Sequence, residues 1–210
     1  MSFNQGYIPQ NHLDKAKTDD VYFTPSHIAR VAMAELAMTF PDFEPVNCLE
    51  PGGGLCAHLD QAVKIFPGIS TTSVDPNSYG EIDDVHEDLA LDFMTWETNE
   101  KFDLIATNPP FTLAHQFLEK SYDMLTDDGL GLFLLRYSFV ATLKRRELWR
   151  KVNLRYIWVL VPRPSFVSDG KSTDACEYAY FIFSKGRPGR PVLDWIEWRK
   201  YKDACNGERS

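Results

Sequence analysis

The sequence predicts a single α/β domain built on a mostly parallel, doubly wound sheet. Short apolar or β-branched runs alternate with segments of helical spacing, and turn residues end nearly every run. The length of 210 residues suits one domain with a core of its own.

The first predicted element is a helix that starts after Thr24-Pro25-Ser26, because Pro suits a first helical turn and Ser or Thr a cap. Its body, HIARVAMAELAMTF, has helical apolar spacing and ends before Pro41. Residues 1–20 are polar, and we expect them to form a flexible segment. The folded domain is therefore expected over residues 21–186.

Strands and further helices alternate after this point. The last two strands are joined by a loop rather than by a clear crossover helix, so the final strand should run antiparallel in a sheet of seven strands. Residues 187–210 are interpreted as a short basic C-terminal extension. Helices are predicted at 57–66, 113–125 and 143–152, and strands at 47–49, 70–74, 103–107, 130–135, 156–161 and 178–184.

The net charge of −8 is unevenly distributed along the chain. Residues 1–135 hold 6 Lys and Arg against 22 Asp and Glu, whereas residues 136–210 hold 16 against 8. This split predicts a basic face on an acidic body, which a polyanion such as nucleic acid would use. Within LKRRELWRKVNLR, Lys144, Arg145 and Arg146 are the candidate phosphate contacts. Alternatively, this stretch is only a solvated helix face.

Membrane insertion, secretion and metal binding are not expected. No run approaches the roughly 18 apolar residues of a membrane span, and the N-terminus has no apolar signal core. The cysteines at 48, 56, 176 and 205 form no C-x-x-C pair, and the five histidines are scattered. We therefore expect a cytoplasmic protein of a bacterial or phage-infected cell, with no zinc site.

Loops that directly follow predicted strands carry the candidate site residues, because ligands of such sheets bind at the carboxyl ends of the strands. In LEPGGGLC, residues 49–56, three glycines let the backbone turn sharply and approach a ligand closely. Glu50 stands at the strand end, where its carboxylate can face a cationic group.

Two more acids follow later strands. Asp75 ends the run STTSVD, and an acid at this place commonly holds ribose hydroxyls, although a simple turn residue before Pro76 is an open alternative. In Leu91-Asp92-Phe93, a carboxylate beside an aromatic ring can bond to and pack against an adenine ring.

The fourth loop, Asn108-Pro109-Pro110-Phe111, follows DLIAT. The exocyclic amine of adenine is a poor nucleophile because its lone pair is delocalised into the ring. The Asn108 side-chain oxygen and the Pro109 carbonyl can each accept an amino hydrogen and so free that lone pair. Pro110 fixes the direction of the Pro109 carbonyl, and Phe111 offers a ring on which the base can stack. The tetrapeptide thus predicts catalysis by positioning, without a strong base.

Together these motifs resemble those of the gamma-group adenine-N6 DNA methyltransferases, including short phage forms. TNPPF is similar to the signature of amino-methyltransferases, and VYFTPSHIARVAMAEL to the F-T-P-like segment that precedes the cofactor loop. VNCLEPGGGLCAHL resembles that loop, and LALDFMTWETNEKFDLIATNPPF the segment from an adenine-binding Asp-Phe to the catalytic tetrapeptide. Order and spacing agree from about residue 22 to residue 140.

The resemblance implies a Rossmann-like domain that uses S-adenosylmethionine to methylate adenine N6 in DNA, on a base extruded from the stack. It places Phe166 against the flipped base. The catalytic residues that it implies are Asn108, Pro109, Pro110 and Phe111. The cofactor-binding residues that it implies are Phe23, Thr24, Pro25, Glu50, Gly52, Gly54, Asp75, Asp92, Phe93 and Asn108.

The sequence departs from that family at three points. Cys56 stands where the family usually has the last glycine of its cofactor loop. An alignment shifted by two residues would put Ser73, rather than Asp75, on the ribose-binding acid. We also expect no separate target-recognition domain, so a partner subunit or a homo-oligomer would supply target selection.

Other functions stay open at this point. An RNA adenine-N6 methyltransferase would suit the small size, because structured RNA can be chosen by shape. Protein glutamine methylation fits the tetrapeptide but lacks a visible peptide-binding domain. A catalytically silent scaffold subunit is expected to lose the acceptor residues, yet Asn108 and Pro109 are present. The F-T-P-like segment favours DNA.

Overall fold

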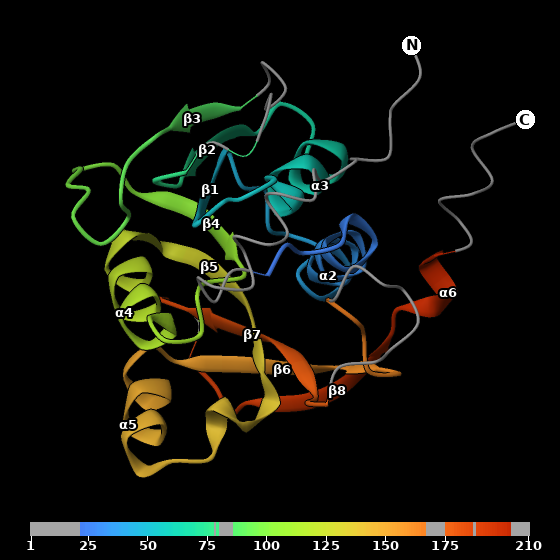
Figure 1. Ribbon diagram of the computed structural model, residues 1–210. Coiled ribbons are helices and arrows are strands. Elements are labelled where there is room, and N and C mark those ends of the chain that lie inside the picture. The colour runs from blue at the N-terminus through green and yellow to red at the C-terminus, as the bar shows by residue number, and fades with distance from the viewer. Residues whose placement is uncertain (1–21, 78, 80–85, 167–174, 187, 203–210) are drawn as a thin grey trace, which may run out of the picture.

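The computed structural model describes residues 22–77, 79, 86–166, 175–186 and 188–202. It shows one eight-stranded sheet in the order β3-β2-β1-β4-β5-β7-β6-β8 (Figure 1). The expected flexible segment 1–20 lies outside the described residues. The strands are β1 (Asn47–Pro51), β2 (Ser70–Val74), β3 (Glu87–Leu89), β4 (Phe102–Thr107), β5 (Leu125–Arg136), β6 (Leu154–Val161), β7 (Tyr178–Ser184) and β8 (Val192–Glu197).

The predicted α/β fold with a mostly parallel sheet is confirmed. β7 runs antiparallel to both β5 and β6, as the loop before it predicted, whereas β1, β2, β3, β4 and β5 pair in parallel. The sheet nevertheless has one strand more than the expected seven. β8 pairs in parallel with β6 and lies inside the segment interpreted as an extension. Its sequence, VLDWIE, gave no strand signal because only Ile196 is buried.

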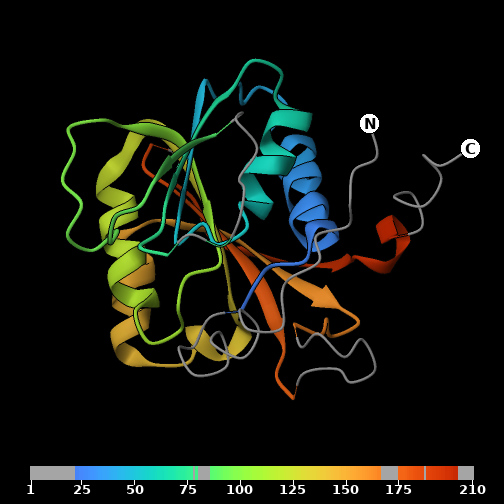
Figure 2. The same ribbon diagram turned by 45° about the horizontal axis from the view of Figure 1, so that its top comes forward.

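The helices cover both faces of the sheet (Figure 2). α2 (Ser26–Thr39) and α3 (Ala57–Ile65) lie on one face, and α4 (Ala114–Met124) and α5 (Leu143–Lys151) on the other. Each face has its own apolar core, since successive strand residues point to opposite sides of the sheet. A 3₁₀ turn, η1 (Tyr137–Val140), precedes α5, and a short α6 (Arg199–Lys202) follows β8.

Two of the strand ends are tied to each other. The Thr107 hydroxyl at the end of β4 donates a hydrogen bond of 2.6 Å to the carbonyl of Pro51 at the end of β1. The glycine-rich loop and the Asn108 loop therefore leave the sheet side by side. Among the described residues, no helix combines the length and the apolar character that a membrane crossing requires.

Candidate active site

A pocket of about 220 Å³ lies at the carboxyl ends of β1, β2 and β4. It collects residues from all four loops that the sequence singled out, as expected for a parallel sheet. Glu50, Asp75 and Asp92 line it, and no Lys or Arg does so among the described residues. The predicted site residues in its lining are Phe23, Thr24, Glu50, Gly52, Gly54, Asp75, Asp92, Phe93, Asn108, Pro109, Pro110 and Phe111.

The glycine-rich loop forms the floor of this pocket. Gly54 has a φ of +55°, and a side chain there would meet the ring of Phe23 at 3.3 Å. Cys56 adopts a similar left-handed conformation (φ 54°) at the N-cap of α3, a conformation that glycine adopts without strain. Burial, followed by the charge of Glu50, raises the pKa of the Cys56 thiol to about 12. This thiol is therefore not a nucleophile at neutral pH.

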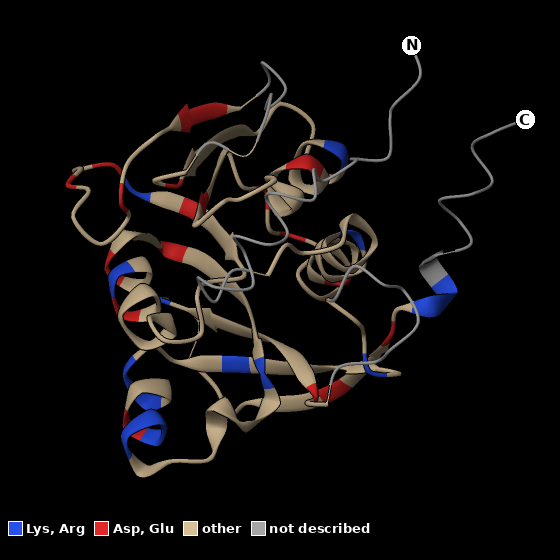
Figure 3. Ribbon diagram, viewed as in Figure 1, with Lys and Arg blue, Asp and Glu red and all other residues tan. Residues whose placement is uncertain are grey.

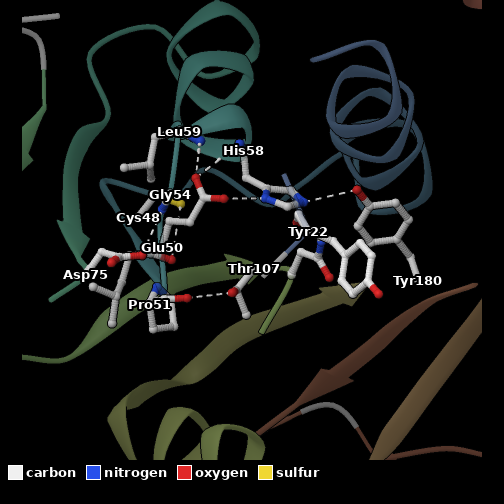
Figure 4. Close-up of polar contacts among 12 residues, drawn as sticks. Tyr22, Cys48, Glu50, Pro51, Gly54, His58, Leu59, Asp75, Thr107 and Tyr180 are labelled. Carbon is white, nitrogen blue, oxygen red and sulfur yellow. Dashed lines mark hydrogen bonds and ion pairs between the residues drawn. The ribbon is translucent and has the colours of Figure 1, made fainter. Parts of the chain in front are cut away.

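Glu50 is almost fully buried and belongs to an internal hydrogen-bond chain (Figure 4). Its Oε2 accepts hydrogen bonds of 3.1 Å from the backbone N–H groups of His58 and Leu59, in the first turn of α3. Its Oε1 lies 2.5 Å from Nδ1 of His58. Nε2 of His58 lies 3.0 Å from the hydroxyl of Tyr180 on β7.

Both ring nitrogens of His58 therefore have a buried partner, the Glu50 carboxylate at Nδ1 and the Tyr180 hydroxyl at Nε2. Burial, and then the charge of Glu50, raise the pKa of Tyr180 well above its ordinary value, so the phenol keeps its proton. The sequence prediction for Glu50 placed it before a cationic ligand group and did not foresee His58. Glu50 on β1 and His58 on α3 share no regular spacing that would signal a pair, and Tyr180 is 122 residues from His58.

Asp75, which follows β2, also lines the pocket and is buried. Its carboxylate accepts hydrogen bonds from the N–H groups of Gly54 (3.1 Å) and Asn77 (2.8 Å). Burial raises the pKa of Asp75, against the lowering effect of these hydrogen bonds. Ser73, the other candidate for the ribose-binding position, is fully buried behind Gly53 and does not line the pocket.

The Asp92–Phe93 loop is held in place from α4. The ammonium group of Lys120 donates to the carbonyls of Phe93 (2.6 Å), Met94 (3.3 Å) and Trp96. The Phe93 ring packs against Phe117 with a centroid separation of 4.9 Å. Asp92 stays exposed and accepts from the Met94 N–H, so its carboxylate lies at the pocket mouth with capacity for further hydrogen bonds.

The side-chain amide of Asn108 has a defined orientation. Its Nδ2 donates a hydrogen bond of 2.8 Å to the backbone carbonyl of Tyr22. Because the amide nitrogen is used in this way, Oδ1 is the atom left to accept hydrogen bonds from a ligand. Pro109 and Pro110 follow in the pocket lining, and neither has a backbone N–H that could compete for the acceptors.

Phe111 belongs to an aromatic cluster at one end of the pocket. Its ring lies 5.6 Å from that of Tyr22 and 6.1 Å from that of Tyr178. Phe166 packs edge-on against Tyr178 at 4.6 Å, but does not itself line the pocket. The guanidinium carbon of Arg136 lies over Phe111, 4.5 Å from the ring centroid. Arg136 was not predicted as a site residue; the signal that could have found it is its place at the end of β5, in alternation with the buried Leu132 and Leu134.

The remaining predicted residues lie outside the pocket. Pro25 is the N-cap of α2. Lys144, Arg145 and Arg146 lie on α5, where basic residues gather (Figure 3). Arg145 stacks over Phe139 and Arg146 pairs with Glu147 at 2.7 Å, so part of this charge is already engaged. In the described part of the chain, no group of three or more His, Cys, Asp or Glu residues could hold a metal ion.

Comparison with known proteins gives both a sequence relative and structural neighbours. No protein-family model matches the chain. The chain is 39% identical over 105 residues to the Type II methyltransferase M.CvrRI of Paramecium bursaria Chlorella virus XZ-6E. That match covers 47% of this chain and 27% of the viral enzyme, about a quarter of its length. The resemblance to DNA methyltransferases inferred from the motifs is thereby confirmed.

Solved structures share the fold across nearly the whole chain. A Listeria monocytogenes protein assigned as a class I S-adenosylmethionine-dependent methyltransferase superposes with a TM-score of 0.69 and 13% identity, covering 95% of this chain and 75% of that one. The modification subunit assigned to a type I restriction enzyme from Vibrio vulnificus YJ016 gives 0.62 and 14%, covering 96% and 56%. The fold is therefore that of class I S-adenosylmethionine-dependent methyltransferases.

Proposed function

We propose that this protein transfers a methyl group from S-adenosylmethionine to the N6 amino group of adenine in DNA. The observation that carries the proposal is the orientation of Asn108, whose amide nitrogen is bonded to the Tyr22 carbonyl so that Oδ1 is free to accept. Support for the reaction class comes from the viral Type II methyltransferase relative and from the shared fold.

The residues that line the pocket suit the chemistry of the cofactor. The close backbone of the glycine loop would hold the methionine part, Asp75 would accept from the ribose hydroxyls, and Asp92 with Phe93 would bind the adenine. Glu50 keeps a carboxylate at the loop end, fixed by α3 and His58. When bound, S-adenosylmethionine supplies an electrophilic methyl group on a sulfonium.

The chain's own residues would activate the acceptor nitrogen. Oδ1 of Asn108 and the carbonyl of Pro109 would each accept one amino hydrogen, which draws the adenine nitrogen out of conjugation and directs its lone pair toward the methyl group. Phe111 would stack on the extruded base, a contact worth about 1–3 kcal/mol in nucleic-acid binders. Phe166, behind Tyr178, would support this aromatic wall.

DNA selection would need surface outside this pocket. Lys144, Arg145 and Arg146 would contact phosphates without reading sequence. A partner subunit would supply target recognition, a proposal supported by the likeness to a restriction-enzyme modification subunit. The place of action would be the cytoplasm of a bacterial or phage-infected cell.

The test is a methyl-transfer assay with labelled S-adenosylmethionine and duplex DNA, single-stranded DNA or structured RNA, followed by digestion and identification of the nucleoside. We expect N6-methyladenine from DNA. Asn108→Ala should lower kcat by about 10²–10³-fold, by analogy with loss of one oxyanion-hole donor. Asn99→Ala, at an exposed position outside the pocket, is the matched control.

Each other outcome assigns a different function. A methylated RNA nucleoside would replace DNA by RNA as the substrate. Transfer to cytosine would retain the mechanism and change the base. Tight cofactor binding without transfer to any nucleic acid would favour glutamine methylation or a scaffold role, and wild-type kcat in Asn108→Ala would refute the activation mechanism.

A further inference from the structure

Arg136 occupies an unusual position at the end of β5. Leu130, Leu132 and Leu134 are fully buried on the sheet face that packs against α2 and α3. Side chains of a strand alternate between the two faces, so Arg136 continues this row beyond the core. Its side chain is exposed there, at the carboxyl end of β5 and on the same side of the sheet's strand ends as the pocket.

The guanidinium of Arg136 packs on an aromatic ring but forms no ion pair with a described residue. It lies over the Phe111 ring at 4.5 Å, and no carboxylate pairs with it in the described part of the chain. Other arginines differ in this respect: Arg146 and Arg150 pair with Glu147, and Arg163 lies 3.9 Å from Glu177. The hydrogen-bond donors of Arg136 are thus available to an external anion.

The charges of the pocket favour a cation beside any nucleotide that binds there. Three carboxylates line the pocket and no basic side chain does so among the described residues. A phosphodiester approaching Phe111 would be repelled by these carboxylates unless a cation stood beside it. Among the described residues, Arg136 is the cation in contact with Phe111.

We propose that Arg136 binds a phosphodiester group flanking the target nucleotide while Phe111 stacks on the base of that nucleotide. This proposal rests on the proposed function and adds a positioning residue to it. A guanidinium suits the role because its planar fork of N–H donors matches phosphate oxygens and because the same plane stacks on an aromatic ring. One sugar joins the base to the phosphate, so a nucleotide whose base lies on Phe111 brings its phosphate to the neighbouring guanidinium.

The experiment removes one partner of the proposed ion pair at a time, either the phosphate charge in the DNA probe or the Arg136 charge in the protein. The probe is a fluorescent single-stranded oligothymidine with one central adenine, made with natural linkages or with a neutral methylphosphonate at the linkage 5′ or 3′ to the adenine. Affinities are measured by anisotropy, with S-adenosylhomocysteine present. The proteins are wild type, Arg136→Gln, Arg136→Lys and Arg190→Gln. Arg190 precedes β8 and lies at the amino ends of β5 and β8, whereas Arg136 lies at the carboxyl end of β5. The Arg190 variant therefore controls for loss of one positive charge.

We expect wild type to lose about tenfold in affinity at one of the two neutral linkages, as for a charge-assisted hydrogen bond. Arg136→Gln should lose about the same factor on the natural probe and nothing further at that linkage. Its salt slope should fall by about one. Arg136→Lys should keep part of the affinity, and Arg190→Gln should show the wild-type response to the neutral linkage.

Two results would overturn this proposal while leaving the proposed function in place. If the losses from Arg136→Gln and from each neutral linkage multiply, the guanidinium contacts the base or another phosphate. If Arg136→Gln binds all probes as wild type does, Arg136 has no role in holding the nucleotide. A wild-type protein that binds S-adenosylhomocysteine but none of the probes would instead overturn the proposed function, and the role of Arg136 with it.

Discussion

Removal of the Tyr180 hydroxyl tests whether the chain from Glu50 through His58 to Tyr180 acts as one unit. In Tyr180→Phe, Nε2 of His58 loses its partner at 3.0 Å in a fully buried site. A stranded buried polar group costs about 1–3 kcal/mol. We therefore expect the free energy of unfolding to fall by about 2 kcal/mol, which for a domain of this size lowers Tm by roughly 4–8 °C.

Replacement of His58 removes the side chain that contacts the Glu50 carboxylate directly. His58→Leu leaves Glu50 with only the two backbone N–H groups of α3, in a site where its side chain is 3% exposed. Loss of a hydrogen-bond partner from a buried carboxylate in this way costs about 1–3 kcal/mol or more. It also frees the Glu50 carboxylate to move, so S-adenosylhomocysteine should bind more weakly in calorimetry.

The double variant decides between a coupled chain and independent contacts. Once His58 is leucine, the Tyr180 hydroxyl itself becomes the stranded group. Tyr180→Phe should then be neutral or stabilising in guanidinium chloride unfolding, opposite in sign to its effect in the wild-type background. Tyr156→Phe is the control, since that hydroxyl makes no hydrogen bond to the described residues, and it should change stability by less than about 0.5 kcal/mol. An equal cost of Tyr180→Phe in both backgrounds would refute the coupling.

The remaining predictions concern the cofactor and the basic helix. Asp92→Ala should weaken S-adenosylhomocysteine binding clearly with Tm retained, and wild-type affinity by calorimetry would remove Asp92 from the site. Burial raises the pKa of Asp75, so as pH falls its carboxylate should be protonated before an ordinary aspartate is, and cofactor affinity should fall at that higher pH. Asp75→Asn should bind weakly at every pH, without this transition. Charge reversal of Lys144 and Arg145 should weaken binding to all nucleic acids and flatten its salt dependence, and an unchanged slope would make α5 a solvated face only.

Much of the fold could be predicted because its signals are local. The apolar runs at β1, β2, β4 and β7 end in glycine, proline or polar turns, so both the strands and their loops could be found from the sequence. The tetrapeptide from Asn108 to Phe111 could be interpreted because the chemistry of an amine needs acceptors at that place. What was missed has no local signal, because β3 is only three residues long and β8 is mostly exposed.

The site details that could not be predicted depend on contacts between distant residues. In the sequence His58 is one of five scattered histidines, and only the fold brings it between Glu50 and Tyr180. The orientation of the Asn108 amide depends on a backbone carbonyl at Tyr22, 86 residues earlier, which no side-chain pattern reveals. A role for Arg136 can be inferred only from the fold, because β5 places it over Phe111.

The strand β8 also has a consequence for the solution behaviour of this protein. It forms one edge of the sheet and exposes Val192, Leu193 and Trp195, the last at 60%. An exposed apolar edge strand is a template onto which other chains can add. Asp194 and Glu197 interrupt this run with negative charge. Colloidal stability at high concentration therefore depends on these two carboxylates, and their replacement by neutral amides favours edge-to-edge aggregation even while the pocket stays folded.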